Sequence, residues 1–520
     1  MEAPTAYDEV SYPGWPYPLS HPDHLAMLAR LFGMAPADPA RCRVLELGCG
    51  DGGNLFPIAL AWPQARVVGI DLAESAIARA RRAIEATGLG NLDLRCGDLA
   101  SLPDDLGEFD YVIAHGVYSW VPEAVRRALL EACRRVLAPQ GVAFVSYNVL
   151  PGGHLRRMLR EMLLMHVEGI EGPQARCAAA RDFLAWVCLA QPEGPPGTGR
   201  SALAQEAERL SKRPDSSLFH DDLSDEFHLC YFRDFCAEAD AHGLQFLAEA
   251  EFFEMQDQDL PKAARERLEA FAPDLVAREQ YLDFLKERRF RQTLLCRADV
   301  ELRSEIRGDA IWELSLSSAA LPEGKEVDPL SGEEQHYRSR RGSLFSTNQP
   351  LLKTALALLR REWPRAMAAG ELLQVAATGC GQPAGPEQRT LLANLALACF
   401  ASGSLDLHAR QAPFARWPGP RPAASPLARL QARDGRHVTN LLGATVELDD
   451  PLAARLLPLL DGSRDRAALL AAIRRDGAAM AELRAAANGN TDARSLAQAL
   501  DRCLDGIGRC ALLLAGPASA

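Results

Sequence analysis

The chain has 520 residues, of which 48% are hydrophobic and 24% are charged. These values are typical of folded proteins and exclude extensive disorder, while the length predicts more than one domain. With 57 basic and 69 acidic residues, the formal net charge of −12 disfavours non-specific nucleic-acid binding. No apolar run is long enough for a membrane span, and the first residues lack the pattern of a secretory signal. We therefore expect a cytoplasmic protein with neither nucleic acid nor membrane as a partner.

The 13 cysteines are scattered along the chain, and no two of them have CxxC spacing. This pattern argues against a zinc ribbon, a thioredoxin-like site and a disulfide framework. We expect reduced thiols, mostly buried as small apolar side chains, and no metal site.

Apolar runs typical of strands alternate with helical segments over the first 155 residues. This alternation indicates βαβ units and a parallel sheet. The strands are expected at Val44–Leu47, Arg66–Ile70, Leu92–Arg95, Tyr111–Ala114 and Val142–Ser146, and the helices at Ala73–Thr87 and Glu123–Leu137.

Helical periodicity replaces this alternation in the middle of the chain, so residues 156–310 are expected to form a mainly helical domain. The helices are expected at Leu155–His166, Ala178–Leu189 and Ala202–Leu210, with Gln191–Gly199 as a loop or linker.

Residues 311–520 are expected to form an α+β domain. The residues of Glu334–Asn348 indicate a β-hairpin, Pro350–Arg361 an amphipathic helix, and the proline-rich Gln411–Ala424 an extended segment. In Val438–Ile473 a short strand precedes two helices joined by an Asp-Gly turn, which is typical of a winged-helix-like unit. The acidic surroundings disfavour DNA as its partner.

The stretch Val44–Asn54 (VLELGCGDGGN) predicts a strand that enters a glycine-rich turn and then a helix. Gly48 and Gly50 allow the backbone to turn sharply and approach a ligand, and the following helix points free N–H groups toward it. Asp71 ends the next strand, 21 residues after Gly50. An acid at that spacing can accept from both hydroxyls of an adenosine ribose.

NAD and S-adenosyl-L-methionine both suit this geometry, and the acidic residues favour the second. Glu46 would attract the ammonium group of a methionine tail and repel a pyrophosphate, while Asp98 could accept from an adenine amino group. A glycine turn without a ligand is the structural alternative. The residues expected at the cofactor are Glu46, Gly48, Cys49, Gly50, Asn54, Asp71, Leu72, Asp98, Leu99 and His115.

Longer segments resemble a known family. They are YDEVSYPGWPYPLSHPDHLAMLARLFG, VLELGCGDGGNLFPIA, FDYVIAHGVYSWVP, HGLQFLAEAEF, YLDFLKERRFRQTLLC and VTNLLGATVELDDPLAARLLPLLDGSRDRAAL. The chain resembles the bacterial class I methyltransferases with a methyltransferase regulatory domain and a C-terminal extension, a group that includes the rickettsial protein-lysine methyltransferases. The segment from His220 to Phe232 lacks the Asn and Pro that family members often carry there.

This resemblance implies a Rossmann-like methyltransferase domain, a helical regulatory domain and a C-terminal domain with a winged-helix-like unit. It also implies methyl transfer to lysine side chains of a protein substrate. Two alternatives stay open: a small-molecule methyltransferase whose other domains serve dimerisation, and a non-catalytic protein that senses S-adenosylmethionine. A homodimer is compatible with each.

Aromatic side chains and one histidine are the candidates for the acceptor side of the site. His115 follows the fourth expected strand, where it could accept a proton or only a hydrogen bond. Tyr118 and Trp120 could shape a substrate channel or pack in the core. Aromatic walls attract cations, which makes a lid of the Pro-rich N-terminal segment plausible alongside a purely stabilising role. The residues expected at the substrate are Tyr12, Trp15, Tyr17 and Tyr147, with Tyr7 as a further aromatic candidate.

Two polar groups remain. His220, Asp221, Asp222, Asp225 and His228 could bind zinc or iron, but their spacing matches no metal signature, and a solvated helix start is the better interpretation. The basic segment His336–Arg341 could contact an acidic protein substrate or form a solvated hairpin tip.

Overall fold

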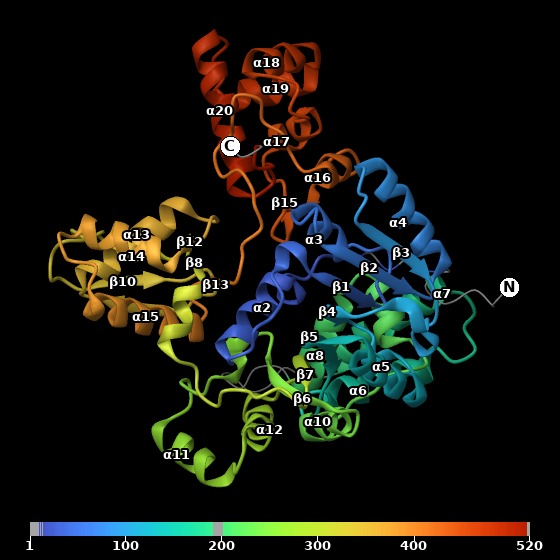
Figure 1. The fold of residues 1–520 in the computed structure, drawn as a ribbon. Helices are drawn as coiled ribbons and strands as arrows, with labels where there is room; N and C mark the ends of the chain where they lie inside the picture. The colour runs from blue at the N-terminus through green and yellow to red at the C-terminus, as the bar shows by residue number, and fades with distance from the viewer. Residues whose placement is uncertain (1–9, 11, 13, 191–200, 517–520) are drawn as a thin grey trace.

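The computed structural model describes residues 10, 12, 14–190 and 201–516, so the expected loop Gln191–Gly199 and Tyr7 lie outside the described residues. A seven-stranded sheet forms the centre, with strand order β3-β2-β1-β4-β5-β7-β6 (Figure 1). The first five strands are parallel and lie where strands were expected, with β5 beginning five residues earlier than expected. They are β1 (Arg43–Leu47), β2 (Arg66–Asp71), β3 (Leu92–Cys96), β4 (Phe109–Ala114) and β5 (Leu137–Asn148).

Helices cover both faces of the sheet. The parallel strands present apolar side chains on each face, and these must be shielded from water. On one face, Val44 and Phe144 join a core with Leu28 of α2 (Pro22–Leu31). On the other, Leu45 and Val145 join a second core. The covering helices are α3 (Leu55–Ala61), α4 (Glu74–Thr87), α5 (Glu123–Val136) and α10 (Phe232–Ala241).

The sheet crosses the expected boundary at residue 155. Strands β6 (Leu244–Glu249) and β7 (Phe290–Arg297) come from the range expected to be helical and pair antiparallel, with β7 against β5. The sheet is therefore mixed rather than wholly parallel. The strands were missed because each is a single run between much longer helical segments.

Arg291 of β7 lies fully buried and joins these late strands to a helix. Its guanidinium donates to Glu249 of β6 at 2.8 Å and to Asp283 of α12 (Leu275–Lys286) at 2.9 Å. A buried charge costs several kcal/mol unless it is paired, so β6, β7 and α12 depend on one another.

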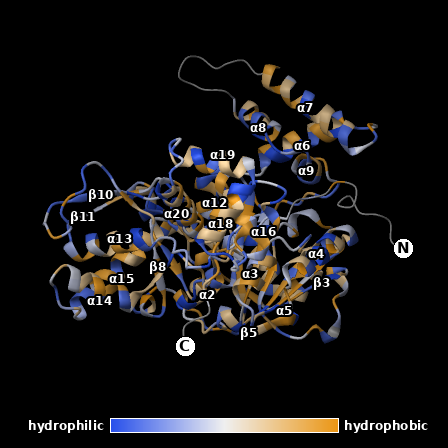
Figure 2. Ribbon diagram, turned by 90° about the horizontal axis from the view of Figure 1, so that it is seen from above, coloured by the Kyte–Doolittle hydropathy of each residue, from blue (hydrophilic) through white to orange (hydrophobic). Residues whose placement is uncertain are grey.

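The helices between β5 and α10 project from the sheet and enclose a small core of their own (Figure 2). They are α6 (His154–His166), α7 (Pro173–Ala190), α8 (Ala202–Ser211), α9 (Asp215–Ser217) and a π-helix, η6 (Leu218–Asp222). The helix α11 (Lys262–Phe271) and α12 lie between β6 and β7. The three helices expected here are present, with α7 starting five residues earlier than expected.

The region from residue 311 to 410 combines small sheets with three helices. The expected hairpin is formed by β10 (Gln335–Arg338) and β11 (Leu344–Thr347), which pair antiparallel. The further elements are η8 (Gly308–Glu313), β8 (Ser315–Ser317), β9 (Leu321–Pro322), α13 (Pro350–Glu362), β12 (Met367–Ala368), α14 (Ala369–Gly379), α15 (Pro386–Ala401) and β13 (Asp406–His408).

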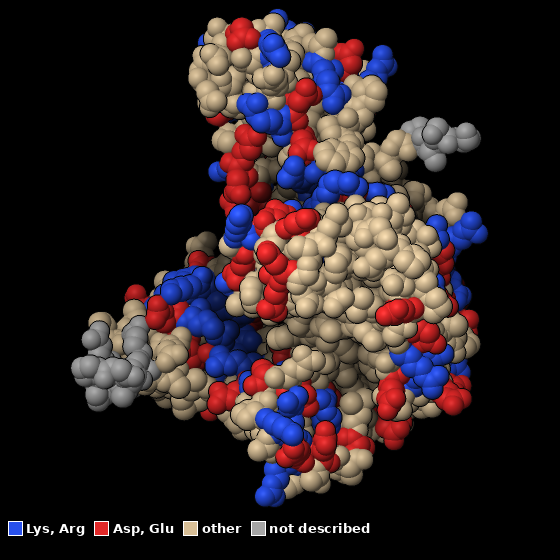
Figure 3. Space-filling view, turned by 90° about the vertical axis from the view of Figure 1, so that its left-hand side faces the viewer, with Lys and Arg blue, Asp and Glu red and all other residues tan. Residues whose placement is uncertain are grey.

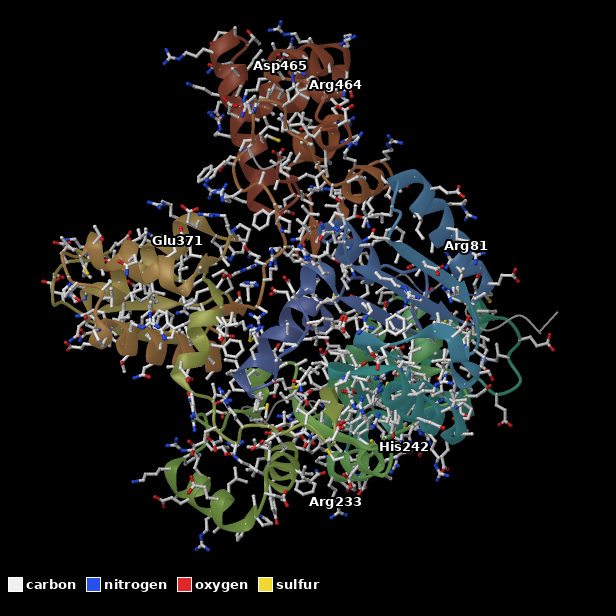
Figure 4. The ribbon with its side chains drawn as sticks, viewed as in Figure 1. Arg81, Arg233, His242, Glu371, Arg464 and Asp465 are labelled. Atoms are coloured by element: carbon white, nitrogen blue, oxygen red, sulfur yellow. The ribbon has the colours of Figure 1, made fainter. Side chains whose placement is uncertain are left out.

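The C-terminal region is a separate unit around its own apolar core, and it stands above the sheet in Figure 1. Its elements are α16 (Pro426–Gln431), β14 (His437–Thr439), β15 (Thr445–Glu447), α17 (Pro451–Leu456), α18 (Arg466–Arg475), α19 (Gly477–Ala486) and α20 (Ala493–Arg509). Asp465 caps the N-terminus of α18 by accepting from Ala468 N at 2.9 Å. It lies in the part of the C-terminal unit that is farther from the sheet (Figure 4). In the described part of the chain, no helix has the length and apolarity needed to cross a membrane.

Candidate functional site

The turn after β1 depends on glycine at residue 48. Gly48 has a φ of +75°, and a Cβ there would lie 2.4 Å from Cγ2 of Val117. A side chain is therefore excluded both by the left-handed backbone and by contact with the loop that follows β4. Cys49 next to it is buried, and Gly50 has a φ of +55°. The turn thus brings the partly exposed backbone of Gly48 and Gly50 to the carboxyl edge of the sheet.

Glu46, near the end of β1, is a buried carboxyl group with one oxygen to spare. Asn54 Nδ2 donates to its Oε1 at 2.9 Å, while Oε2 has no hydrogen-bond partner among the described residues. Burial raises the pKa of Glu46 to about 8, against the opposing effect of the Asn54 hydrogen bond. A buried acceptor without a donor is unusual, and an ammonium group of a ligand would satisfy it.

Asp71 at the end of β2 holds the glycine turn. Its Oδ2 accepts from Gly50 N at 2.7 Å and its Oδ1 from Ala73 N at 2.8 Å. Leu72 beside it is 47% exposed, and Asp98 after β3 is exposed with Oδ1 accepting from Ala100 N. Together with half-buried Leu99, these residues leave an open edge suited to a nucleoside. These carboxylate acceptors therefore fit the ammonium, the ribose hydroxyls and the adenine amino group of S-adenosylmethionine.

His115 follows β4, and its Nδ1 has no partner among the described residues. Burial lowers the pKa of His115 to about 4. The imidazole is therefore neutral at pH 7, and its low pKa makes it a weak base, so a hydrogen-bonding role suits it better than a role as proton acceptor. The ring of Tyr17 lies against it, with 3.5 Å between the ring centroids.

The N-terminal strap, which we define as Val10, Tyr12 and residues 14–21, lies over the glycine turn. A Cβ on Gly53 would be 2.4 Å from the carbonyl oxygen of Gly14, so the two backbones are in direct contact. Tyr17 N donates to Asn54 Oδ1 at 2.8 Å, which ties the strap to the partner of Glu46.

The strap also contacts two other regions. Tyr12 packs edge-on against His220 of η6 at 5.6 Å, and His220 Nε2 lies 2.7 Å from the carbonyl oxygen of Val10. Trp15, 45% exposed, packs edge-on against His437 of β14 at 6.2 Å. One short segment therefore joins the sheet, the helical region and the C-terminal unit.

Two tyrosines expected at the substrate are instead buried in the core. Tyr118 is 0% exposed, and its hydroxyl donates to Glu238 of α10 at 2.5 Å. Tyr147 is 1% exposed and stacks on Phe235 at 4.0 Å. Both side chains point toward α10, so we correct their expected roles to packing between the sheet and this helix.

Trp120 is half-buried and belongs to a different cluster from His115. Its ring lies 5.3 Å from that of Phe227, and the guanidinium of Arg156 on α6 lies 5.6 Å from its centroid. This arrangement attaches α6 to the loop after β4.

The acidic pair on η6 is bound by arginines. Asp222 is fully buried between Arg156 and Arg213, with contacts of 3.0 and 2.7 Å, and Asp221 pairs with Arg213 at 2.9 Å. His228 lies apart from them, against Tyr118. No group of three or more His, Cys, Asp or Glu side chains in the described ranges is arranged to hold a metal ion.

Arg340 and Arg341, in the hairpin of β10 and β11, line a cavity of about 630 Å³. The cavity lies between the sheet domain, the region from residue 311 to 410 and the C-terminal unit. Arg340 lies over Trp363 at 4.9 Å, and Arg341 pairs with Glu251 at 2.5 Å. The cavity also borders the strap at Pro18 and Leu19. Figure 3 shows basic side chains gathered in a hollow on one face of the molecule.

Three segments match known families. Residues 44–141 match a methyltransferase domain, residues 214–297 a predicted methyltransferase regulatory domain, and residues 420–512 the C-terminal winged-helix domain of PKMT. The regulatory segment contains β6 and β7, so it completes the sheet as well as covering it.

Two uncharacterised proteins of Rickettsia prowazekii are similar in sequence. One is 38% identical over 357 residues, which is 67% of this chain and 64% of that protein, so the match leaves over a third of that protein uncovered. The other is 31% identical over 45% of this chain and 93% of its own length. The structure of PKMT2 from Rickettsia typhi superposes with a TM-score of 0.82 and 25% identity, covering 97% of this chain and all of that one; PKMT2 has also been solved in complex with AdoHcy.

The glycine turn, its acids and the seven-stranded sheet define a class I S-adenosylmethionine-dependent methyltransferase. The chain belongs to the family of these enzymes that carries a methyltransferase regulatory domain and a PKMT-type C-terminal winged-helix domain.

Proposed function

We propose that the protein transfers a methyl group from S-adenosylmethionine to lysine side chains of a protein substrate. The observation that carries the cofactor assignment is Glu46, a buried carboxyl with an oxygen that lacks a donor, next to a turn held by Asp71. The match to PKMT2 over nearly the full chain supports the acceptor assignment.

Each acidic residue of the site would bind a different part of the cofactor. Glu46 would bind the ammonium of the methionine tail, Asp71 the ribose, and Asp98 the adenine. When bound, the cofactor supplies an electrophilic methyl group on a sulfonium. The strap would exclude water, and transfer then depends mainly on aligning the nucleophile with that methyl group.

The regions beyond the sheet favour a macromolecular acceptor over a small one. The similarity to the arsenite methyltransferase of Aquipseudomonas alcaligenes is 31% identity over only 32% of this chain. The similarity to PKMT2 covers 97%, including the helical and winged-helix regions. The large cavity that borders the strap is also suited to a polypeptide.

The test is transfer of labelled methyl into a lysate of the source cell, counted separately in protein and small molecules. Asp71→Asn should reduce the labelled methyl-lysine released by protein hydrolysis by roughly 10-fold or more, because it loses a charged hydrogen-bond acceptor. Asp93→Asn is the matched control, since Asp93 is an exposed acid on β3 that pairs only at the surface. Label confined to small molecules would favour the small-molecule alternative. Tight cofactor binding without any labelled product would favour a sensor.

A further inference from the structure

Phe290 is a partly exposed aromatic residue on a firmly held strand. It begins β7 and is 39% exposed, whereas the next residue, Arg291, is fully buried with its ion pairs. The carbonyl oxygen of Arg289 accepts from Val149 N at 3.0 Å, which ties the chain just before Phe290 to the residue that follows β5. In the described part of the chain, the ring of Phe290 joins neither core of the sheet. Its backbone is therefore fixed while its ring stays available.

The register of the sheet places Phe290 on the same face as the cofactor carboxylate. Phe290 pairs with Asn148, the last residue of β5, so it lies at the edge where the parallel strands end. Side chains alternate between the two faces along a strand, and Phe144 of β5 packs in the core on the α2 face. Asn148 follows it by four residues, and directly paired residues point to the same side, so Phe290 lies on the α2 face. Glu46 lies there as well, two residues after Val44 of the same core.

His115 lies between these two groups, because β4, which it follows, lies between β1 and β5. The ring of Tyr17 lies against it at 3.5 Å between centroids, and the ring of Phe290 is edge-on to it at 6.5 Å. Tyr17 is 39% exposed, like Phe290. Two partly exposed aromatic rings from distant segments therefore meet at one imidazole, whose Nδ1 has no partner among the described residues.

We infer that Phe290 and Tyr17 form the aromatic wall that receives the ammonium group of the acceptor lysine beside His115. The inference rests on the proposed lysine acceptor. Neighbouring strands lie about 5 Å apart, and β7 is three strands from β1 in the sheet, so Phe290 and Glu46 are separated by roughly 14 Å of sheet. This separation leaves room for the methionine tail at Glu46 and for the acceptor at Phe290, with His115 between them.

Aromatic rings suit this acceptor before and after methyl transfer. Protonated lysine and methylated lysine are both cations, and the faces of phenylalanine and tyrosine attract a cation within about 6 Å of the ring centroid. Burial lowers the pKa of His115 to about 4, so the imidazole is neutral and does not repel the incoming charge. Its free Nδ1 would accept a hydrogen bond from the amine.

The segment that supplies Phe290 belongs to residues 214–297, which match the predicted methyltransferase regulatory domain. The ion pairs of Arg291 with Glu249 and Asp283 hold β7 to β6 and α12 of the same segment. The regulatory segment thus contributes directly to binding of the acceptor, and the strap contributes the second ring.

The experiment compares wild type with Phe290→Ala and the control Phe271→Ala, which removes a 56% exposed ring from α11. The readout is the initial rate of labelled methyl-lysine formation in the protein fraction of a source-cell lysate, at saturating S-adenosylmethionine and increasing lysate protein. Phe290→Ala should raise the half-saturating protein concentration by roughly 10-fold, the size of a partly desolvated cation–π contact. The maximal rate should stay within about 3-fold of wild type, because the contact acts on binding. Phe271→Ala should match wild type in both quantities.

Two further variants separate an aromatic contact from packing. Phe290→Tyr keeps a ring face and should stay within about 3-fold of wild type, whereas Phe290→Leu keeps apolar bulk and should lose nearly as much as Phe290→Ala. Calorimetry should show wild-type affinity for S-adenosylmethionine in all three variants. Equal recovery by Phe290→Leu and Phe290→Tyr, or weaker cofactor binding in Phe290→Ala, would overturn the assignment.

The outcome for wild type separates this inference from the function on which it rests. Wild type that forms methyl-lysine alongside a fully active Phe290→Ala would overturn this inference alone. Wild type that forms no methyl-lysine would overturn the proposed function and this inference with it.

Discussion

The cofactor side and the acceptor side of the site are built in different ways. Glu46, Gly48 and Asp71 come from one β-turn-α-β segment, and the Asp71 carboxylate holds the turn by accepting from Gly50 N. Tyr17 and His115, and likewise Tyr12 and His220, come from segments far apart in the chain and meet through ring contacts. The cofactor side is therefore rigid and locally encoded, whereas the acceptor side exists only when three regions are assembled.

The largest effect is expected from Gly48→Ala, which alters the glycine turn on the cofactor side. The substitution forces a left-handed residue to carry a side chain, at a cost of roughly 1–2 kcal/mol, and drives its Cβ into Val117. The turn must move, so we expect affinity for S-adenosylmethionine to fall by about 100-fold, measured by calorimetry.

Gly90→Ala is the matched control for this prediction. A Cβ on Gly90 meets nothing within 4 Å, and affinity should stay unchanged. If Gly48→Ala bound the cofactor normally, the cofactor side would be more adaptable than its geometry indicates.

A smaller effect is expected from Tyr17→Ala, which removes a side chain of the strap on the acceptor side. The variant loses the ring contact with His115 but keeps the backbone hydrogen bond from residue 17 to Asn54. We therefore expect methyl transfer to fall by roughly 10-fold through lost positioning, with cofactor affinity changed by less than about 3-fold. Single-turnover rates and calorimetry measure the two quantities. Equal losses of transfer rate and cofactor affinity would show that the strap contributes to both sides of the site alike.

Proton release gives a finer test of Glu46. Since its pKa in the folded protein is about 8, the carboxyl is mostly protonated at pH 7, and binding of an ammonium group should expel the proton. Calorimetry of S-adenosylmethionine binding in buffers of different ionisation enthalpy should detect most of one proton released at pH 7 for wild type. Glu46→Gln should show none, and a buffer-independent enthalpy in wild type would contradict the assignment.

The same carboxyl affects stability without ligand. A raised pKa in the folded state means that the folded chain binds more protons than the unfolded chain between the ordinary carboxyl pKa of 4.5 and about 8. The free energy of unfolding contributed by Glu46 therefore falls as pH rises through this window and is constant below it. Glu46→Gln should flatten the pH dependence of thermal stability between pH 5 and 8.

The smallest effect on activity is expected from Tyr118→Phe, which tests the corrected role of this residue. The change removes the hydrogen bond to Glu238 inside the packing between sheet and α10. We expect a loss of about 1–2 kcal/mol in the free energy of unfolding and a rate within about 2-fold of wild type. A large loss of rate with unchanged stability would return Tyr118 to the active site.

The sequence predicted the parts of the molecule whose information is local. The five parallel strands, the hairpin after Gln335 and the acids at the strand ends follow from periodicity and turn residues. The directions of Tyr118 and Tyr147 could not be predicted, because aromatic residues after a strand suit a pocket and a core equally. The contact of Tyr12 in the strap with His220 of η6 could not be predicted either, because the two segments are about 200 residues apart.

The completion of the sheet by β7 has a consequence for synthesis on the ribosome. Strand β5 is finished at residue 148, but its second neighbour, β7, ends only at residue 297. Until then, the nascent chain carries an unpaired strand edge of apolar residues, which is a site for wrong pairing. The helices made in the interval can enclose their own core first. A chain shortened to its first 155 residues would retain that open edge permanently, so we expect it to aggregate rather than to act as a minimal enzyme.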